Sequence, residues 1–260
     1  MPLGLYIKST PRYNVTTGPL DGYDASKYVA YSMNRRLVGS YTGPLFRVRR
    51  SSDNAEMDIP QAGTIVDMGT FNSFVGSDTA YVTKWYDQGG RIFDMAQSVA
   101  SAQPIIVTVG GFLLQQSDGV DDQLISAQVL NETFNYFQAV YLNNRIGTAS
   151  HTLIYSTGNH GAAGNAEARE HMSNLHWATS EDDANNMLQI LSSAPLWNEH
   201  HIRGDWADVS TKTMSWYRDG VQQASQQAST YNNAILKGEV QVHNNNTYKG
   251  VGNLGEIVLY

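Results

Sequence analysis

The stretch that decides the fold reads AYSMNRRL at residues 30–37, SYTGPLFRVRRSSDNAEMDI at residues 40–59 and YVTKWYDQGG at residues 81–90. In its middle part Phe46 and Val48 alternate with Arg47 and Arg49, which is typical of a strand with one buried and one charged face. The last part is an aromatic, β-branched run that ends in turn residues. Two strands with a connection between them are therefore expected near the start of the chain.

Further strand-like segments continue to the end of the chain, separated by turn signals rather than by helices. Asp219-Gly220 supplies the positive φ angles that a tight hairpin turn needs, and the polar run at residues 222–230 indicates a surface loop or an exposed edge. Strands spaced in this way predict a two-sheet sandwich rather than a parallel α/β sheet. The expected strands after residue 80 cover residues 81–86, 104–109, 136–142, 152–155, 187–191, 213–217, 239–243 and 252–260.

The pattern before residue 40 predicts an arm and a helix. Residues 1–25 are rich in proline and glycine and show no periodicity. We expect them to form an extended arm that docks on a neighbouring subunit or, equally well, an edge strand packed on its own domain. A helix is then expected from Asp24 or Ser26, either of which can cap it, up to Gly39. Ala30, Met33 and Leu37 would lie on one face of it. Residues 26–260 contain no linker and are expected to form a single domain.

Composition narrows the classes of partner. The chain has 260 residues, a formal net charge of −7 and no cysteine. An acidic surface repels nucleic acid, so we expect no nucleic-acid partner. We find no signal peptide at the N-terminus and no apolar run long enough to insert into a membrane.

The three stretches quoted first resemble the start of the catalytic module of the α-L-arabinofuranosidase B family, a start that phage structural proteins share. The resemblance covers roughly residues 28–124 and implies an all-β, concanavalin-like two-sheet jelly-roll sandwich with one N-terminal helix. In that family a Tyr-Asp-Gln-Ser-Gly run closes a strand and opens a loop, and Gly89 stands here in place of the serine. Asp87 and Gln88 are expected to bind backbone amides and hold the loop's shape, with ligand contact as the alternative.

Two charged clusters have both a structural and a functional interpretation. Residues 117–124 (SDGVDDQL) are similar to a run in laminin-G and concanavalin-like domains. Their carboxylates either form a turn or hold Ca²⁺. The arginines at 47, 49 and 50 either pair with nearby acids or bind an acidic polysaccharide or a subunit. The possible calcium ligands are Asp118, Asp121 and Asp122, and no other metal site or cofactor is expected.

Residues 158–208 hold most of the histidines and tryptophans. Aromatic rings pack on the apolar faces of sugars while imidazoles and acids bind hydroxyls, so this mixture favours a shallow sugar site. The alternative is that each tryptophan belongs to the core and each histidine to the surface. The candidate carbohydrate-binding residues are Trp177, Trp197, Trp206, His176, His201, Glu167 and Asp205.

A retaining glycosidase needs two carboxyl groups about 5–5.5 Å apart. Candidate acids occur between residues 167 and 205, and Gly164-Asn165-Ala166-Glu167 is similar to a segment that lines the sugar pocket of the resembled family. The adjacent cysteines that precede this segment in the family are missing. We therefore assign no catalytic residue from the sequence.

These observations favour a non-enzymatic structural protein of a phage virion: a capsid decoration, collar or tail-associated subunit. Its lectin-like domain would bind host-surface polysaccharide, and its N-terminal arm would bind other virion proteins in a homo-oligomer. The missing cysteines and signal peptide motivate this placement in a virion assembled in the host cytoplasm. The alternatives are a glycoside hydrolase of arabinofuranosidase type and a free carbohydrate-binding module.

Overall fold

The computed structural model describes most of the chain after residue 16. The described ranges are 17–134, 136–145, 151–158, 166–171, 175–181, 187–193, 201–208, 210–227, 234–244 and 252–260. Within them the chain forms antiparallel strands and one α-helix, α1 (Met68–Val75). Among the described residues no helix has the length and hydrophobicity of a membrane span. The predicted all-β class is confirmed.

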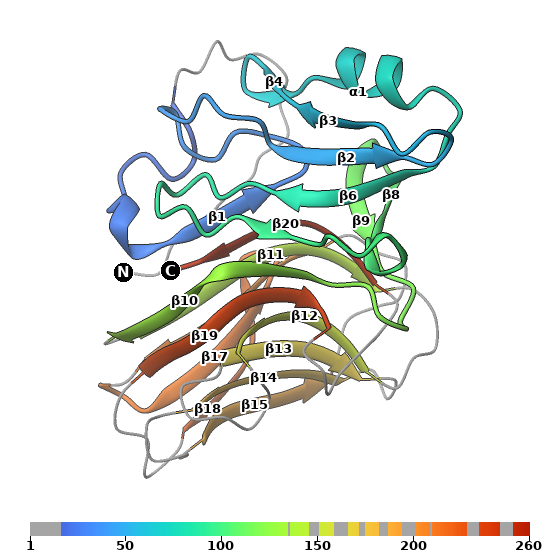
Figure 1. The fold of residues 1–260 in the computed structure, drawn as a ribbon. Coiled ribbons are helices and arrows are strands. Elements are labelled where there is room, and N and C mark those ends of the chain that lie inside the picture. The colour runs from blue at the N-terminus through green and yellow to red at the C-terminus, as the bar shows by residue number, and fades with distance from the viewer. Residues whose placement is uncertain are drawn as a thin grey trace.

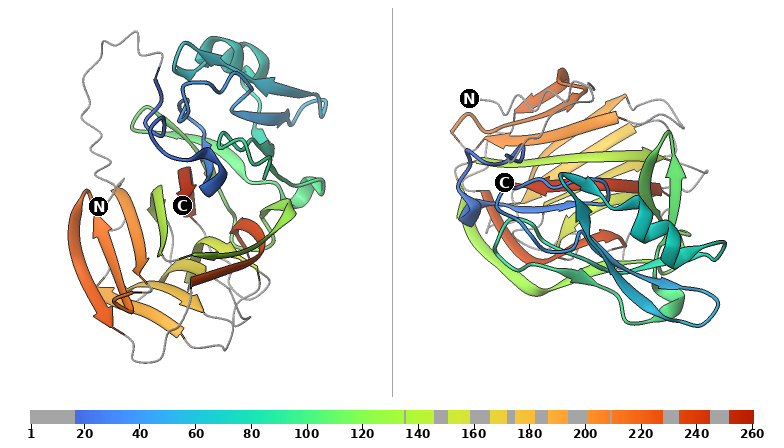
Figure 2. Two further views of the ribbon diagram at one scale, coloured as in Figure 1. Left: turned by 90° about the vertical axis from the view of Figure 1, so that its left-hand side faces the viewer. Right: turned by 90° about the horizontal axis from the view of Figure 1, so that it is seen from above.

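Two layers of strands form the sandwich, and Figures 1 and 2 show them facing each other. In the first layer β20 pairs with β1 and β9 along one edge and with β11 along the other, and β16, β17 and β18 follow. The strands of the first layer are β1 (Val29–Ser32), β9 (Phe112–Gln116), β20 (Gly252–Leu259), β11 (Tyr136–Arg145), β16 (His201–Asp208), β17 (Thr213–Arg218) and β18 (Val221–Gln227).

The second layer runs in the order β7, β10, β19, β12, β13, β14 and β15. Its far edge approaches the far edge of the first layer, because β15 lies near β17 and β18. The strands of the second layer are β7 (Met95–Ala96), β10 (Leu124–Phe134), β19 (Ala234–His243), β12 (His151–Thr157), β13 (Ala166–His171), β14 (Leu175–Glu181) and β15 (Met187–Ser193).

The N-terminal sheet, made of β2, β3 and β6, lies across one end of the sandwich (Figure 1). It joins the second layer because β6 pairs with β7, and the first layer because β6 pairs with β8, which pairs with β9. Its strands are β2 (Phe46–Arg50), β3 (Glu56–Ile59) and β6 (Ala80–Trp85), and the linking strand is β8 (Ile105–Val109). The smaller elements are β4 (Gln61–Ala62), β5 (Ile65–Val66) and the 3₁₀ turns Ala25–Lys27 and Ala100–Ala102.

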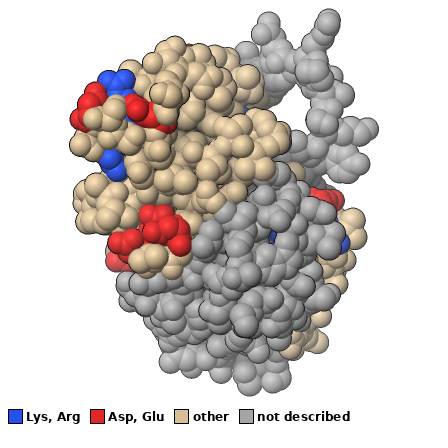
Figure 3. Space-filling view, turned by 90° about the vertical axis from the view of Figure 1, so that its right-hand side faces the viewer, with Lys and Arg blue, Asp and Glu red and all other residues tan. Residues whose placement is uncertain are grey.

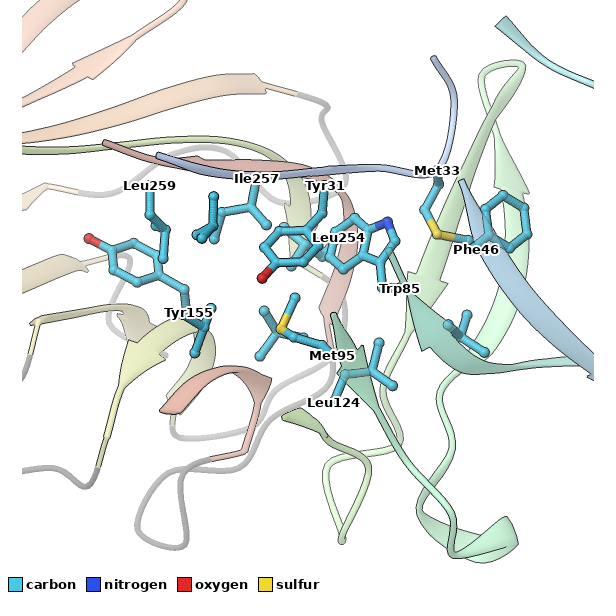
Figure 4. Packing of buried hydrophobic residues seen from close by; sticks show 14 of the residues in the cluster. Tyr31, Met33, Phe46, Trp85, Met95, Leu124, Tyr155, Leu254, Ile257 and Leu259 are labelled. Atoms are coloured by element: carbon cyan, nitrogen blue, oxygen red, sulfur yellow. The ribbon is translucent and has the colours of Figure 1, made fainter. Parts of the chain in front are cut away.

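One hydrophobic cluster runs through the N-terminal sheet and both layers. Figure 4 shows Trp85 of β6 against Tyr31 of β1 and Leu254 of β20, and the same cluster continues to Tyr155 of β12. The rings of Tyr31 and Trp85 lie 5.4 Å apart, within the range of favourable aromatic contact. This one core is therefore shared by residues from the N-terminal sheet and from both layers.

An ion pair fastens β20 to the start of the chain. Arg35 donates from Nε and Nη2 to the two carboxylate oxygens of Glu256, at 2.9 and 2.7 Å, and the Ser32 hydroxyl donates to the same carboxylate at 3.1 Å. Glu256 is buried. A buried carboxylate is tolerated here because the bidentate arginine and the hydroxyl satisfy it.

The turn after β6 has the structural role predicted for it. Asp87 Oδ1 accepts hydrogen bonds from the backbone N–H groups of Ala30 (2.9 Å) and Gly89 (2.8 Å), and Oδ2 accepts one from Phe93 (3.2 Å). Gln88 accepts a hydrogen bond from the N–H of Leu37 at 2.7 Å. The two side chains therefore tie residues 30–37 to the end of β6.

The predicted helix between residues 24 and 39 is wrong. Only Ala25–Lys27 forms a 3₁₀ turn, and the chain then enters β1, which pairs with β20. Ala30, Met33 and Leu37 are all buried, but Met33 belongs to the main core while the other two pack in a separate small cluster. The spacing of these three residues resembles that of a helix, but it arises because they are buried in two different hydrophobic clusters. Among the described residues the α-helix starts instead at Met68, capped by Asp67.

The predicted strands are confirmed, with bounds that differ by a few residues. Asp219 and Gly220 have φ angles of 51° and 81° in the hairpin between β17 and β18, as the turn chemistry predicts. The polar run after Val221 forms β18, an exposed edge strand. Of the predicted arm, residues 1–16 lie outside the described residues, while Leu20 is buried and its N–H donates to the Leu37 carbonyl at 2.9 Å.

Substituting Gly89 with alanine tests the turn after β6. A Cβ at Gly89 would lie 2.6 Å from the Tyr28 carbonyl oxygen, so Gly89→Ala should lower the free energy of unfolding by about 1–3 kcal/mol. Gly22→Ala is the control, because a Cβ there meets nothing within 4 Å. Urea unfolding of both variants measures the effect, and equal stabilities would contradict this packing.

Neutralising Glu256 tests the ion pair at β20. Glu256→Gln leaves the partly buried Arg35 without its counter-charge and should destabilise the fold by about 3–5 kcal/mol. The control is Asp53→Asn, which removes the exposed bidentate partner of Arg50 and should change the stability far less, because solvent screens an exposed pair. Chemical denaturation compares them, and a small loss for both would show that the buried pair is dispensable.

Candidate active site between the two layers

Asp205 lies at the middle of β16 with its carboxylate inside the sandwich. It is 0% exposed, and Arg203 and Ala207, each two residues away on the same strand, are also buried. Residues two apart on a strand share a face, so this face of β16 points inward. The backbone register places Asp205 between Ala139 of β11 and Trp216 of β17.

Tyr155 reaches Asp205 from the opposite layer. It belongs to β12, is 0% exposed, and its hydroxyl donates to Asp205 Oδ2 at 3.4 Å. Trp216, 1% exposed, is the cross-strand neighbour of Asp205 and extends an aromatic wall beside it. A carboxylate, a phenol and an indole thus meet between the layers.

The other buried acids among the described residues serve the fold. Asp87 accepts three backbone N–H groups, and Glu256 is paired with Arg35. Burial raises the pKa of Asp87, and those amides oppose the rise. Asp122 accepts the N–H of Asp118 at 2.8 Å, inside a turn. Asp205 is the described buried acid that lies between the two layers, at the middle of β16.

Three of the candidate sugar-binding residues lie on β16. Asp205 faces inward, whereas Trp206 is half-buried and stands opposite Ser215 on the other face of the strand. His201 begins β16, opposite Asn143. Asp205 and Trp206 are therefore held on opposite faces of the first layer.

The remaining candidates belong to the second layer or lie outside the described residues. The register pairs Glu167 of β13 with Ser156 and Thr179. His176 and Trp177 of β14 pair with Glu170 and Arg169 of β13. Trp197 lies outside the described residues. The backbone thus brings β13 to the side of β12, which carries Tyr155, and leaves β14 one strand further away.

Sequence reasoning missed Tyr155, Arg203 and Trp216. The signal for Arg203 was present, because Arg203, Asp205 and Ala207 are spaced two apart, as residues on one face of a strand are. Tyr155 carried no comparable signal, because its strand reads as an ordinary hydrophobic run. Its contact depends on how the two layers stack.

The acidic turn at residues 118–122 has the geometry of a carboxylate-stabilised turn. The N–H of Val120 donates to Asp118 Oδ1 at 2.7 Å, in addition to the bond between Asp118 and Asp122. Carboxylate oxygens of Asp118, Asp121 and Asp122 lie within 4.8 Å of one another. The backbone bonds support the turn-forming interpretation, and calcium binding here stays a prediction.

The arginines of β2 are paired internally, as one of the two interpretations predicts. Arg47 binds Asp58 through two bonds of 2.7 and 2.9 Å, and Tyr86 donates to the same carboxylate at 2.6 Å. Arg50 binds Asp53 in the same bidentate way. On the face drawn in Figure 3, charged groups of the described residues form small separate clusters with uncharged surface between them.

Comparison with known families identifies what this chain is similar to. The sequence model of the family described as "Alpha-L-arabinofuranosidase B, catalytic" matches residues 20–180. A probable α-L-arabinofuranosidase B of Aspergillus fumigatus is 36% identical over 113 residues, and the α-L-arabinofuranosidase B of Aspergillus oryzae is 34% identical over 113 residues. The aligned part is 42% of this chain and 21% of each relative, so the chain spans about a fifth of their length.

Solved structures show the same fold. An arabinofuranosidase complexed with arabinofuranosyl-α-1,2-xylobiose has a TM-score of 0.64 at 14% identity, covering 89% of this chain and 58% of that one. A GH54 α-L-arabinofuranosidase soaked with a cyclic sulfate inhibitor has a TM-score of 0.65 at 16% identity, covering 94% and 61%. At these identities the likeness concerns the fold alone.

The prediction of a non-enzymatic phage virion protein is wrong. The family that matches and the relatives from Aspergillus are α-L-arabinofuranosidases, which favours the glycoside hydrolase alternative. The placement in a virion is corrected for the same reason. That prediction rested on the absence of cysteine, whereas the match over residues 20–180 is to a family of enzymes.

The turn at residues 118–122 should make the stability of the protein depend on pH. Burial raises the pKa of Asp122 to about 6 from its ordinary 3.8, against the opposing bond from the Asp118 N–H. Between those values the folded chain keeps a proton that the unfolded chain has released, so stability should fall as pH rises through this window. Asp122→Asn should remove the fall and add about 2 kcal/mol at pH 7.

Thermal unfolding between pH 3.5 and 7.5 measures this effect, with Asp121→Asn as the control because Asp121 is exposed. The same series with added CaCl₂ separates the two interpretations of the turn. A calcium-dependent rise in melting temperature that Asp122→Asn abolishes would contradict a purely turn-forming role.

Proposed function

Because this chain belongs to the α-L-arabinofuranosidase B catalytic family, we propose that it is a glycoside hydrolase that releases α-L-arabinofuranosyl groups, with Asp205 as one of its two catalytic carboxylic acids. The family match over residues 20–180 supports the reaction class. The position of Asp205 between the layers supports the choice of acid.

The observation that carries the assignment is the set of side chains next to Asp205. Asp205 is fully buried, and it receives a side-chain hydroxyl from the facing layer and lies beside an indole on the neighbouring strand. Aromatic rings next to acids are the mixture that sugar sites use.

The second acid belongs on β13. Hydrolysis of a glycosidic bond needs one carboxyl group to protonate the leaving oxygen and another to act as nucleophile or base. Tyr155 pairs with Ala168 of β13, and Glu167 and Glu170 lie one and two residues from that position. These two glutamates are therefore the candidates to act with Asp205.

Hydrolysis of 4-nitrophenyl α-L-arabinofuranoside tests the proposal. The wild type should release nitrophenol, and Asp205→Asn should lower kcat about 10²- to 10⁴-fold, the range for losing a general acid or base. Asp208→Asn is the matched control, because Asp208 ends the same strand and serves only the turn to Ser210 and Thr211. Circular dichroism and melting temperature confirm that each variant is folded.

Glu167→Gln and Glu170→Gln identify the second acid, since one of them should match the loss of Asp205→Asn. A panel that includes 4-nitrophenyl β-D-xylopyranoside measures substrate class. Wild-type protein that binds arabinofuranosyl oligosaccharides but hydrolyses none of the panel would contradict the proposal, as would full activity in Asp205→Asn.

A further inference from the structure

We propose that the open edge of β8 is a dimerisation surface, at which two copies of this chain pair their β8 strands antiparallel and join their first layers into one sheet. The basis is an unpaired strand edge, the uncharged side chains along it and the way in which the strand complements itself. The homo-oligomer expected from the sequence thereby acquires a defined contact, which does not depend on the catalytic assignment.

One edge of β8 is open. The other edge pairs with β9 along the whole strand. Among the described residues the open edge meets β6 at a single position, Ile105 opposite Tyr81, so residues 106–109 have no strand beside them there. An unpaired edge presents a row of backbone donors and acceptors to which a further strand can bond. The partner that fits this edge is therefore an extended β-strand.

The hairpin turn identifies the backbone groups that point to the open edge. Gly110-Gly111 forms the two-residue turn between β8 and β9, with φ angles of 59° and 85°. Such a turn is closed by a pair that exchanges both hydrogen bonds, and bonded pairs recur at every second residue. Val109 and Val107 therefore bond to β9, while Ile106 and Thr108 direct their N–H and C=O groups to the open edge.

The side chains of the hairpin contain none of the features that keep a second strand away. Natural edge strands are protected by charges, prolines, bulges or a covering loop. Residues 105–116, which form β8, the turn and β9, include no charged residue and no proline, and their pairing has no register shift. Val107 is half-buried, Thr108 is exposed and Phe112 is 45% exposed. Apolar surface therefore remains accessible beside the open backbone.

Other strand edges in the described part of the chain are protected. β3 carries Glu56 and Asp58, which both pair with Arg47. The turn after β6 covers β1, because the N–H and the carbonyl of Ala30 both bond to residues 87–88. β18 has a register shift in its pairing with β17. β8 differs from these edges because it has no charge, no cover and no bulge.

The partner strand that β8 fits best is a second β8. In an antiparallel pair with a two-fold axis at Val107, Ile105 faces Val109 and Ile106 faces Thr108, so every cross-strand pair joins two β-branched side chains. Such pairs pack well on a sheet, and a two-fold contact uses the same surface on both copies. The net charge of −7 opposes self-association, whereas the hairpin contributes no charge to this contact.

This register makes Val107 a specific position for a cross-link. Ile106 and Thr108 of the two copies exchange hydrogen bonds on either side of the axis, so Val107 faces its own copy as a non-hydrogen-bonded pair. The Cα atoms of such a pair lie about 4.5 Å apart, which is within the range that a disulfide bridges. The chain has no cysteine, so a single introduced thiol reports on this contact alone.

Disulfide cross-linking of Val107→Cys tests the pairing. In a glutathione redox buffer this variant should form a covalent dimer, seen at twice the monomer mass on a non-reducing gel. Val221→Cys is the control, because Val221 lies on the edge strand β18 and is 62% exposed, so random collision would favour it. Adding Thr108→Lys to Val107→Cys should slow the cross-linking about tenfold or more, because a lysine on an edge strand opposes pairing.

Sedimentation equilibrium of the unaltered chain measures the association. One strand pair is a small interface, so the dimer should dissociate on dilution. Val107→Lys places two like charges opposite each other and should raise the dissociation constant about tenfold or more, whereas Val221→Lys should leave it unchanged. Circular dichroism and melting temperature show whether each variant folds, and Thr108→Lys, at an exposed position, replaces Val107→Lys if that variant does not.

Three results would overturn the proposal. One is a wild-type chain that stays monomeric at every concentration. Another is cross-linking of Val221→Cys that is as fast as that of Val107→Cys. The third is a dimer that keeps its affinity in Thr108→Lys and Val107→Lys, which would place the interface elsewhere. Hydrolysis is not a readout of these experiments, so the dimer and the proposed function are tested separately.

Discussion

The insertion of β20 between β1 and β11 is the constraint on which the rest of the structure depends. It joins Ser32 to Glu256, which are 224 residues apart, and completes the first layer from strands at both ends of the chain. Closing so long a loop costs conformational entropy before any contact offsets it. The buried Arg35–Glu256 pair and the core around Tyr31 supply local compensation where that closure occurs.

The candidate site depends on this closure because β11 lies between β20 and β16. β11 pairs with β20 on one edge and with β16 on the other, so the register of β20 sets the position of Asp205 through β11. On the facing layer β12 carries Tyr155, whose hydroxyl reaches Asp205. Two strands on opposite sides of the sandwich thus form the site, which links the stability of the fold directly to the geometry of the proposed chemistry.

The conflict over function has a clear origin. The motifs that the chain contains, from the arginine-rich strand at Arg47 to the Asp87-Gln88 turn, led to the correct family. The virion hypothesis came from the absence of cysteine in the sequence and from the expectation that no signal peptide is present. A sequence motif predicts specific contacts that a structure can test, as the three backbone N–H groups bonded to Asp87 show. The absence of a residue type is compatible with many unrelated proteins and predicts no contact.

The sequence by itself determined the features that local chemistry controls. Strand alternation at Phe46 and Val48, the left-handed turn at Asp219 and Gly220, and the bonding role of Asp87 all follow from preferences of a few adjacent residues. Only the tertiary structure decided that Ala30 and Met33 enter separate clusters, and that Tyr155 meets Asp205 from 50 residues away. Those outcomes depend on the pairing of distant strands, which leaves no periodic trace in the neighbouring sequence.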